Sequence, residues 1–259
     1  SRSLFSGWTY DEKSFYYTSN QRNPKYMDIY VMNIYSFKSE MIYQNDDALN
    51  FADVSNDGRY LALNKSHTRD NSDMYLYDVQ SGNLNHISNH EGNVNFNPSS
   101  FSVDSKSLYF LTDKDSEFKY LQKYIIADGT IIEIQKEEWD IWYSYFSHSG
   151  RYRVTGINAD SQTEIEVFDY EKNRPVRLPQ LPAGSISSVS ISKSEKYMAL
   201  YHGSAKSPSD LYLLDVESKK YQKLTNAMNP DVNPEYLGNA KVIRFKSFDG
   251  LEIPAVYYK

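Results

Sequence analysis

The sequence predicts an all-β protein, a β-propeller of five four-stranded antiparallel blades. A strand-and-turn unit recurs about every 45 residues along the chain, and no 3.6-residue helical rhythm separates one unit from the next. Tyrosine, which favours half-buried pleated surfaces, supplies 24 of the 259 residues. Regular β-units without intervening helices are typical of propeller blades.

The first element of the unit is a polar turn followed by an aromatic or aliphatic strand. Successive turn residues are separated by 46, 47, 45 and 45 positions: Asp11, Asp57, Asp104, Ser149 and Ser194. The turns at 56–59 and 149–151 contain Asp-Gly and Ser-Gly, which form hairpins because glycine adopts a positive φ at little steric cost.

A second element follows at the same period. Its first residues are separated by 45, 46, 45 and 46 positions: Asp28, Asp73, Lys119, Glu164 and Asp210. Shorter apolar segments before the first element and after the second complete four strands per unit. An immunoglobulin-like sandwich has no reason to keep so regular a period, so the pattern favours the propeller.

We predict a propeller over residues 1–237, with repeats at about 1–49, 50–94, 95–140, 141–185 and 186–237. Residues 238–259 break the rhythm and read as two strands around the turn at Phe248-Asp249-Gly250. An apolar strand at a chain end leaves an open edge, so we expect these linker strands to lead into a further domain. Five units either close a small ring or form an incomplete one, and the sequence leaves both open.

Composition restricts the partners and the compartment. The net charge is −6 with acidic and basic residues interspersed, so no basic stripe is available for a nucleic acid. No apolar run approaches the ~20 residues needed to span a bilayer, so we predict no membrane role. The chain has no cysteine, which excludes disulfides and thiolate chemistry and suits the cytoplasm or a bacterial periplasm equally.

Residues 207–215, 222–226 and 244–255 resemble the end of the propeller in the prolyl oligopeptidase family of serine peptidases, peptidase family S9, which includes dipeptidyl peptidase IV and acylaminoacyl peptidase. Blade segments such as 101–113 also resemble that family, but TolB-like and WD40-like propellers share them. The resemblance implies that an α/β-hydrolase domain follows Lys259 and that the propeller admits short peptides to it. The partners would then be the protein's own hydrolase domain and oligopeptide substrates. The alternative is a TolB-like protein-binding propeller with no hydrolase attached.

Catalytic residues are not predicted within this chain. Hydrolases of this type place their nucleophile in Gly-x-Ser-x-Gly, and the nearest segment, 203–207, fails at its last position. A metal-dependent propeller lyase would need a channel rich in histidine and glutamate, but the five histidines fall at unrelated blade positions. We therefore predict no catalytic set, no cofactor and no metal.

The adjacent pair Glu137 and Glu138 is the candidate substrate-binding site. In dipeptidyl peptidase IV-like enzymes, which the pair resembles, two glutamates on the propeller bind the free amino terminus of the substrate. A partly buried carboxylate pair attracts an ammonium strongly because a low dielectric magnifies the interaction. The alternative interpretation is a plain surface loop between the third and fourth repeats.

Overall fold

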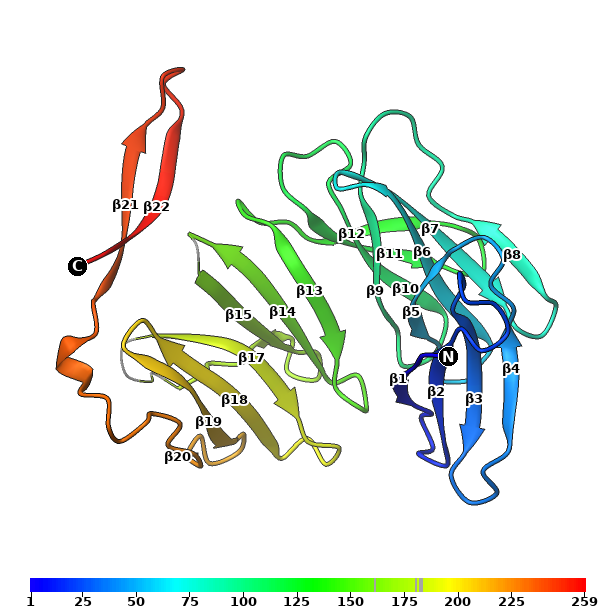
Figure 1. Ribbon diagram of the computed structural model, residues 1–259, viewed down its shortest axis with the longest axis horizontal. Helices are drawn as coiled ribbons and strands as arrows, with labels where there is room; N and C mark the ends of the chain where they lie inside the picture. Colours follow the sequence, from blue (N-terminus) through cyan, green and yellow to red (C-terminus); the bar gives the residue numbers. More distant parts are fainter. Residues whose placement is uncertain (161, 180, 182–183) are drawn as a thin grey trace. The chain divides into compact units, whose positions relative to one another are not determined.

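The computed structural model describes residues 1–160, 162–179, 181 and 184–259. Two compact units make up the chain, Ser1–Lys136 and Glu137–Lys259. Strands and turns form nearly all of both units, and the described residues contain one helical element, the 3₁₀ turn η1 (Pro234–Tyr236) (Figure 1). No helix in these ranges is long and apolar enough to cross a bilayer.

The first unit contains three four-stranded antiparallel sheets, each with its strands in sequence order. Blade 1 consists of β1 (Ser3–Trp8), β2 (Ser14–Ser19), β3 (Asp28–Asn33) and β4 (Ser39–Tyr43). Blade 2 consists of β5 (Asn50–Val54), β6 (Tyr60–Thr68), β7 (Asn71–Asp78) and β8 (Asn83–His86). Blade 3 consists of β9 (Phe96–Phe101), β10 (Ser107–Thr112), β11 (Tyr120–Ile125) and β12 (Ile131–Gln135).

The second unit contains two further blades and a separate hairpin. Blade 4 consists of β13 (Ile141–Phe146), β14 (Tyr152–Ala159), β15 (Gln162–Asp169) and β16 (Arg174–Pro175). Blade 5 consists of β17 (Ser185–Ile191), β18 (Tyr197–Ser204), β19 (Ser207–Asp215) and β20 (Tyr221–Lys223). The hairpin pairs β21 (Ala240–Lys246) with β22 (Glu252–Tyr258). The predicted five four-stranded antiparallel blades are confirmed.

Neighbouring blades within a unit pack face to face. Between blades 1 and 2, buried Ile29 and Leu49 meet Leu61 and Leu63 of β6. Ala62, which lies between these two leucines in β6, packs on the other side, between blades 2 and 3. Its neighbours there are Phe96, Phe101, Leu108 and Phe110. Because successive side chains of a strand point to opposite faces, the first half of β6, residues 60–63, is apolar and packs on both sides, whereas its second half is polar and ends exposed. Blades 4 and 5 share an equivalent core: Tyr152, Val154, Val167, Val189, Met198, Leu200, Tyr212 and Leu214.

One hydrogen bond is repeated at the polar turn of every blade. In each turn a serine or threonine hydroxyl accepts from the backbone N–H five residues later, at 2.8–3.1 Å. The pairs are Thr9 with Ser14, Ser55 with Tyr60, Ser102 with Ser107, Ser147 with Tyr152 and Ser192 with Tyr197. The first periodic series therefore marks turns whose side chains satisfy the first N–H of the second strand.

In blades 1 and 5, the second periodic series marks a carboxylate clamp near the start of the third strand. Asp28 is fully buried and accepts two hydrogen bonds from Arg22, both at 2.8 Å, and one from the Asn45 N–H at 2.8 Å. Asp210 accepts from the Ala227 N–H, also 17 residues later, and pairs with Lys223 at 2.7 Å. The acid thus ties the loop that leaves the fourth strand to the sheet.

Replacing Asp28 with asparagine should destabilise blade 1. Burial opposes ionisation, but hydrogen bonds from Arg22 and Asn45 outweigh it, so the pKa of Asp28 lies below its ordinary value. Its contribution to stability is therefore present above about pH 4 and is lost as the pH falls. At pH 7 we expect the free energy of unfolding in urea to drop by about 2–4 kcal/mol.

Asp46→Asn is the matched control, because Asp46 also pairs with Arg22 at 2.8 Å but its side chain is 56% exposed. Asp46→Asn should lower the free energy of unfolding much less than Asp28→Asn does. Equal losses in the two variants, or a loss for Asp28→Asn that does not shrink as the pH falls below 4, would contradict the clamp.

Candidate functional site

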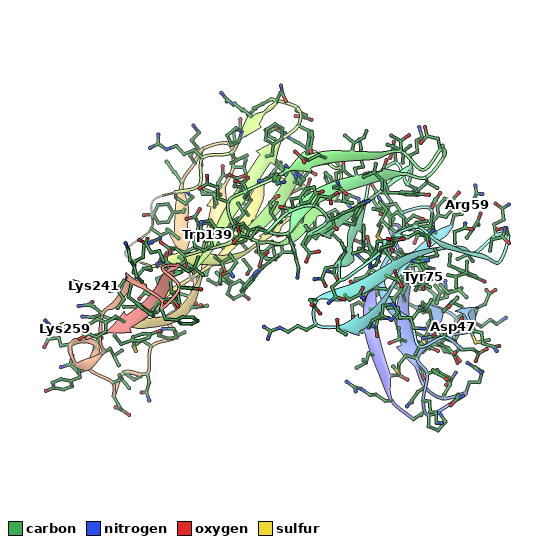
Figure 2. The ribbon with its side chains drawn as sticks, turned by 90° about the horizontal axis from the view of Figure 1, so that it is seen from above. Asp47, Arg59, Tyr75, Trp139, Lys241 and Lys259 are labelled. Carbon is green, nitrogen blue, oxygen red and sulfur yellow. The ribbon has the colours of Figure 1, made fainter. Side chains whose placement is uncertain are left out.

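The predicted pair Glu137 and Glu138 lies in the connection between β12 and β13, where the second unit begins. Glu137 is half-buried and Glu138 is exposed. Trp139, the next residue, is labelled in Figure 2. The pair remains a prediction as a site for an amino terminus.

Three of the five histidines gather around one carboxylate in blade 2. Asp73 lies 2.7 Å from His67 Nε2 and 2.8 Å from His86 Nε2, and His90 Nδ1 is 3.6 Å away. The sequence places only His86 and His90 near one another. His67 joins them because β6 and β7 are paired, with Lys65 opposite Asp73.

This histidine cluster is not a catalytic triad, although Ser88 Oγ lies 3.3 Å from His86 Nε2. A triad histidine binds the serine and the aspartate through different ring nitrogens, whereas here both contacts use Nε2. Ser88 is buried, and its hydroxyl accepts from the Met74 N–H at 2.7 Å. Nor does any group of three His, Cys, Asp or Glu in the described parts of the chain suit a metal ion. The cluster is blade 2's version of the carboxylate clamp.

Side chains connect the first strands of adjacent blades. Asp53 of β5 accepts a 2.8 Å hydrogen bond from the Phe101 N–H of β9. In the second unit, Tyr143 and Tyr145 of β13 donate to the carbonyls of Ser187 and Val189 in β17. Burial raises the pKa of Asp53 to about 6, against the effect of its backbone hydrogen bonds. A perturbed carboxyl group of this kind is a candidate functional group or a structural one.

The hairpin β21–β22 is held against blade 4. Arg244 in β21 donates to Asp160 at 2.6 Å, in the turn between β14 and β15, and also pairs with Glu252 of β22 at 3.3 Å. The turn η1 precedes the hairpin in the chain (Figure 1). The apolar side chains of the hairpin are open to solvent: Phe248 at the tip is fully exposed, and Phe245 and Leu251 are 51% and 64% exposed.

A cavity of about 840 Å³ lies between this hairpin and blade 5. Its lining includes the turn between β18 and β19 and, from β21, Lys241 (Figure 2). An adjoining cavity of about 400 Å³ shares Gln162, Gly184 and Ser185 with it and is lined by His202. Both belong to the second unit, so this end of the chain combines an apolar hairpin with polar hollows.

Residues 3–227 match the profile of the prolyl oligopeptidase N-terminal β-propeller domain. The chain belongs to this propeller family. No curated protein sequence matches it.

Solved structures agree with this prolyl oligopeptidase propeller in fold. One from a study of two prolyl endopeptidases has a TM-score of 0.74 and 19% identity, over 98% of this chain and 39% of that one. Prolyl oligopeptidase B from Galerina marginata, bound to a 35mer hydrolysis and macrocyclization substrate, has a TM-score of 0.73 and 16% identity, over 99% and 38%. TolB from Acinetobacter baumannii has a TM-score of 0.61 and 17% identity, over 88% and 55%. The propeller thus spans little more than a third of the peptidase chains it matches.

Several residues described above are not predictable from the sequence as site residues. Asp160 and Arg244 are 84 positions apart, and neither belongs to a recognisable motif. Asp53 gives a weak signal, since a carboxylate is unusual within a strand such as 50–54. His202 gives none.

Replacing Asp53 with asparagine should stabilise the propeller at neutral pH. A folded-state pKa of about 6, above the ordinary value, means that protonated Asp53 stabilises the fold at low pH and that this stability is lost as the pH rises through 6. Asparagine can accept from the Phe101 N–H without carrying a charge. We expect a gain in unfolding free energy of about 2–3 kcal/mol at pH 8 that vanishes below pH 4.

Asp115→Asn is the control, because Asp115 is exposed and its φ of 55° suits asparagine equally. Urea unfolding from pH 4 to pH 8 measures the difference. A pH-independent effect of Asp53→Asn would show that its charge is not the cause.

Proposed function

We propose that this chain is the substrate-gating propeller of a serine peptidase that hydrolyses short peptides, and that it is itself non-catalytic. The observation that carries the proposal is the β21–β22 hairpin. It adds no strand to blade 5, Arg244 fastens it to Asp160, and it presents Phe245, Phe248 and Leu251 to solvent. An apolar surface of this kind suits burial against another domain. We assign residues 238–259 as the linker into an α/β-hydrolase domain, which would supply the serine, aspartate and histidine.

Gating in this proposal is steric. Hydrogen bonds such as the one that the Phe101 N–H donates to Asp53 hold the first strands of neighbouring blades together. Blades held in this way resist the separation that a folded protein would need to pass, whereas an extended peptide is thin enough to enter. The propeller would then select by size without contributing to the chemical step.

The second candidate is a TolB-like propeller that binds proteins and has no hydrolase attached. The likeness to TolB over 88% of this chain supports it. The exposed apolar hairpin favours the peptidase proposal, because a free-standing propeller gains nothing from an open apolar tip.

Assays of the chain and of the complete product of its gene distinguish the two. The chain alone should hydrolyse no peptide, and the complete product should cleave peptides of a few residues while sparing folded proteins. Removing residues 1–237 from the complete product should relax the size limit, or abolish folding, which circular dichroism would reveal. Peptide turnover by the chain alone would contradict the proposal, and a stop codon directly after Lys259 would favour the TolB-like candidate.

Within the same proposal, Glu137 and Glu138 bind the amino terminus of the substrate. In the complete product, the double change to glutamine should raise KM for a peptide with a free amino terminus by at least about tenfold, since ionic hydrogen bonds are lost. KM for the acetylated peptide and kcat for both should change little. Glu117→Gln with Glu133→Gln is the charge-matched control. Equal effects on the free and acetylated peptides would refute the assignment.

A further inference from the structure

The 840 Å³ cavity in the second unit has an unusual charge. We call it the lysine groove, because Lys206 and Lys241 are its only charged lining residues among those described. Serine hydroxyls and the Asn239 amide supply much of the remaining lining. In a chain with a net charge of −6, a hollow lined by two cations and no carboxylate is a local site for anions.

Neither lysine has an ion-pair partner within the described ranges. Lys206 is half-buried in the two-residue turn between β18 and β19, where its backbone N–H donates to Ser204 Oγ at 3.2 Å. Cations on the same elements are neutralised: Lys223 pairs with Asp210, and Arg244 pairs with Asp160 and Glu252. Lys206 is half-buried and Lys241 is exposed, and two neighbouring cations without a counter-charge favour binding of an anion.

Two glycines, Gly184 and Gly203, are among the lining residues of the groove. A Cβ on Gly203 would lie 2.7 Å from Ser209 Oγ, and a Cβ on Gly184 would lie 2.3 Å from the Gly203 carbonyl oxygen. Glycine at both positions lets the chain segments that line the groove approach one another closely.

The adjoining 400 Å³ cavity contains an unused polar atom. His202 is 7% exposed, its ring lies edge-on to Tyr212 at 5.7 Å, and its Nε2 has no hydrogen-bond partner among the described residues. Buried polar atoms of this kind are rare and call for a partner. The two cavities share three lining residues, so one ligand can reach both.

We propose that the lysine groove binds the C-terminal carboxylate of a short peptide. Lys206 and Lys241 would pair with the carboxylate, and His202 Nε2 would hydrogen-bond to the peptide backbone in the adjoining cavity. The lysine groove alone, at about 840 Å³, lies within the size range of pockets that bind small ligands. Peptides as the ligand class rest on the proposed function, but the site needs no catalytic step.

Calorimetric titration of the chain with a pentapeptide tests the site. The free carboxylate form should bind, and its C-terminal amide should bind at least about tenfold more weakly. Lys206→Ala and Lys241→Ala should each weaken binding of the acid several-fold, with little effect on the amide. Added salt should weaken binding of the acid.

Lys246→Ala is the matched control, because Lys246 is exposed on the same strand as Lys241 but does not line the groove. Equal affinity for the acid and the amide, or no effect of either groove lysine, would overturn the proposal. So would inorganic phosphate that binds as tightly and depends on the same lysines, since the groove would then be a general anion site. Peptide hydrolysis by the complete product alongside such a result would leave the proposed function standing.

Discussion

The structure depends on covering both faces of every middle strand. In β6, Leu61 and Leu63 pack towards blade 1 while Ala62 packs towards blade 3, so one strand serves two cores. Blade 1 has an apolar residue at the equivalent repeat position, because Phe5 lies 46 positions, one repeat, before Phe51. Phe51 packs against the core between blades 1 and 2, whereas Phe5 is 60% exposed. The repeat therefore encodes apolar faces suited to stacking.

Polar residues keep the stacked sheets in register at their ends. The turn hydroxyls satisfy the first N–H of the second strand, and the carboxylate clamps satisfy N–H groups in the loops that leave the fourth. Buried backbone donors need such partners, and the clamps of blades 1 and 5 stand at the same position of the repeat. Blade 2 meets the requirement differently, with His67 and His86 around Asp73 where blade 1 uses Arg22 and Asn45.

The blades were predictable from the sequence because their signals are local and repeated. Each turn and each strand can be recognised within about ten residues, and five copies average out the irregularities. The candidate site was not predictable, because its contacts join residues that are distant in sequence, such as Asp53 with Phe101 and Asp160 with Arg244. The folded chain brings these pairs together, and the periodicity of the sequence does not predict which residues meet. Glu137 and Glu138 show the converse. An adjacent pair is easily recognised in the sequence, but the residues that surround it in space cannot be read from its sequence neighbours.

The hairpin and blade 5 of the second unit carry several groups that could still bind a partner. Apolar Phe248 and Leu251 are open to solvent there, Lys206 and Lys241 lack counter-charges among the described residues, and His202 Nε2 lacks a partner. In blade 1, by contrast, buried Asp28 is paired with Arg22. Exposed apolar groups promote aggregation, and an unpartnered buried polar atom costs stability. Groups with such costs are compensated when a ligand or a further domain binds to them, so this end of the unit is where the propeller has most to gain from a partner.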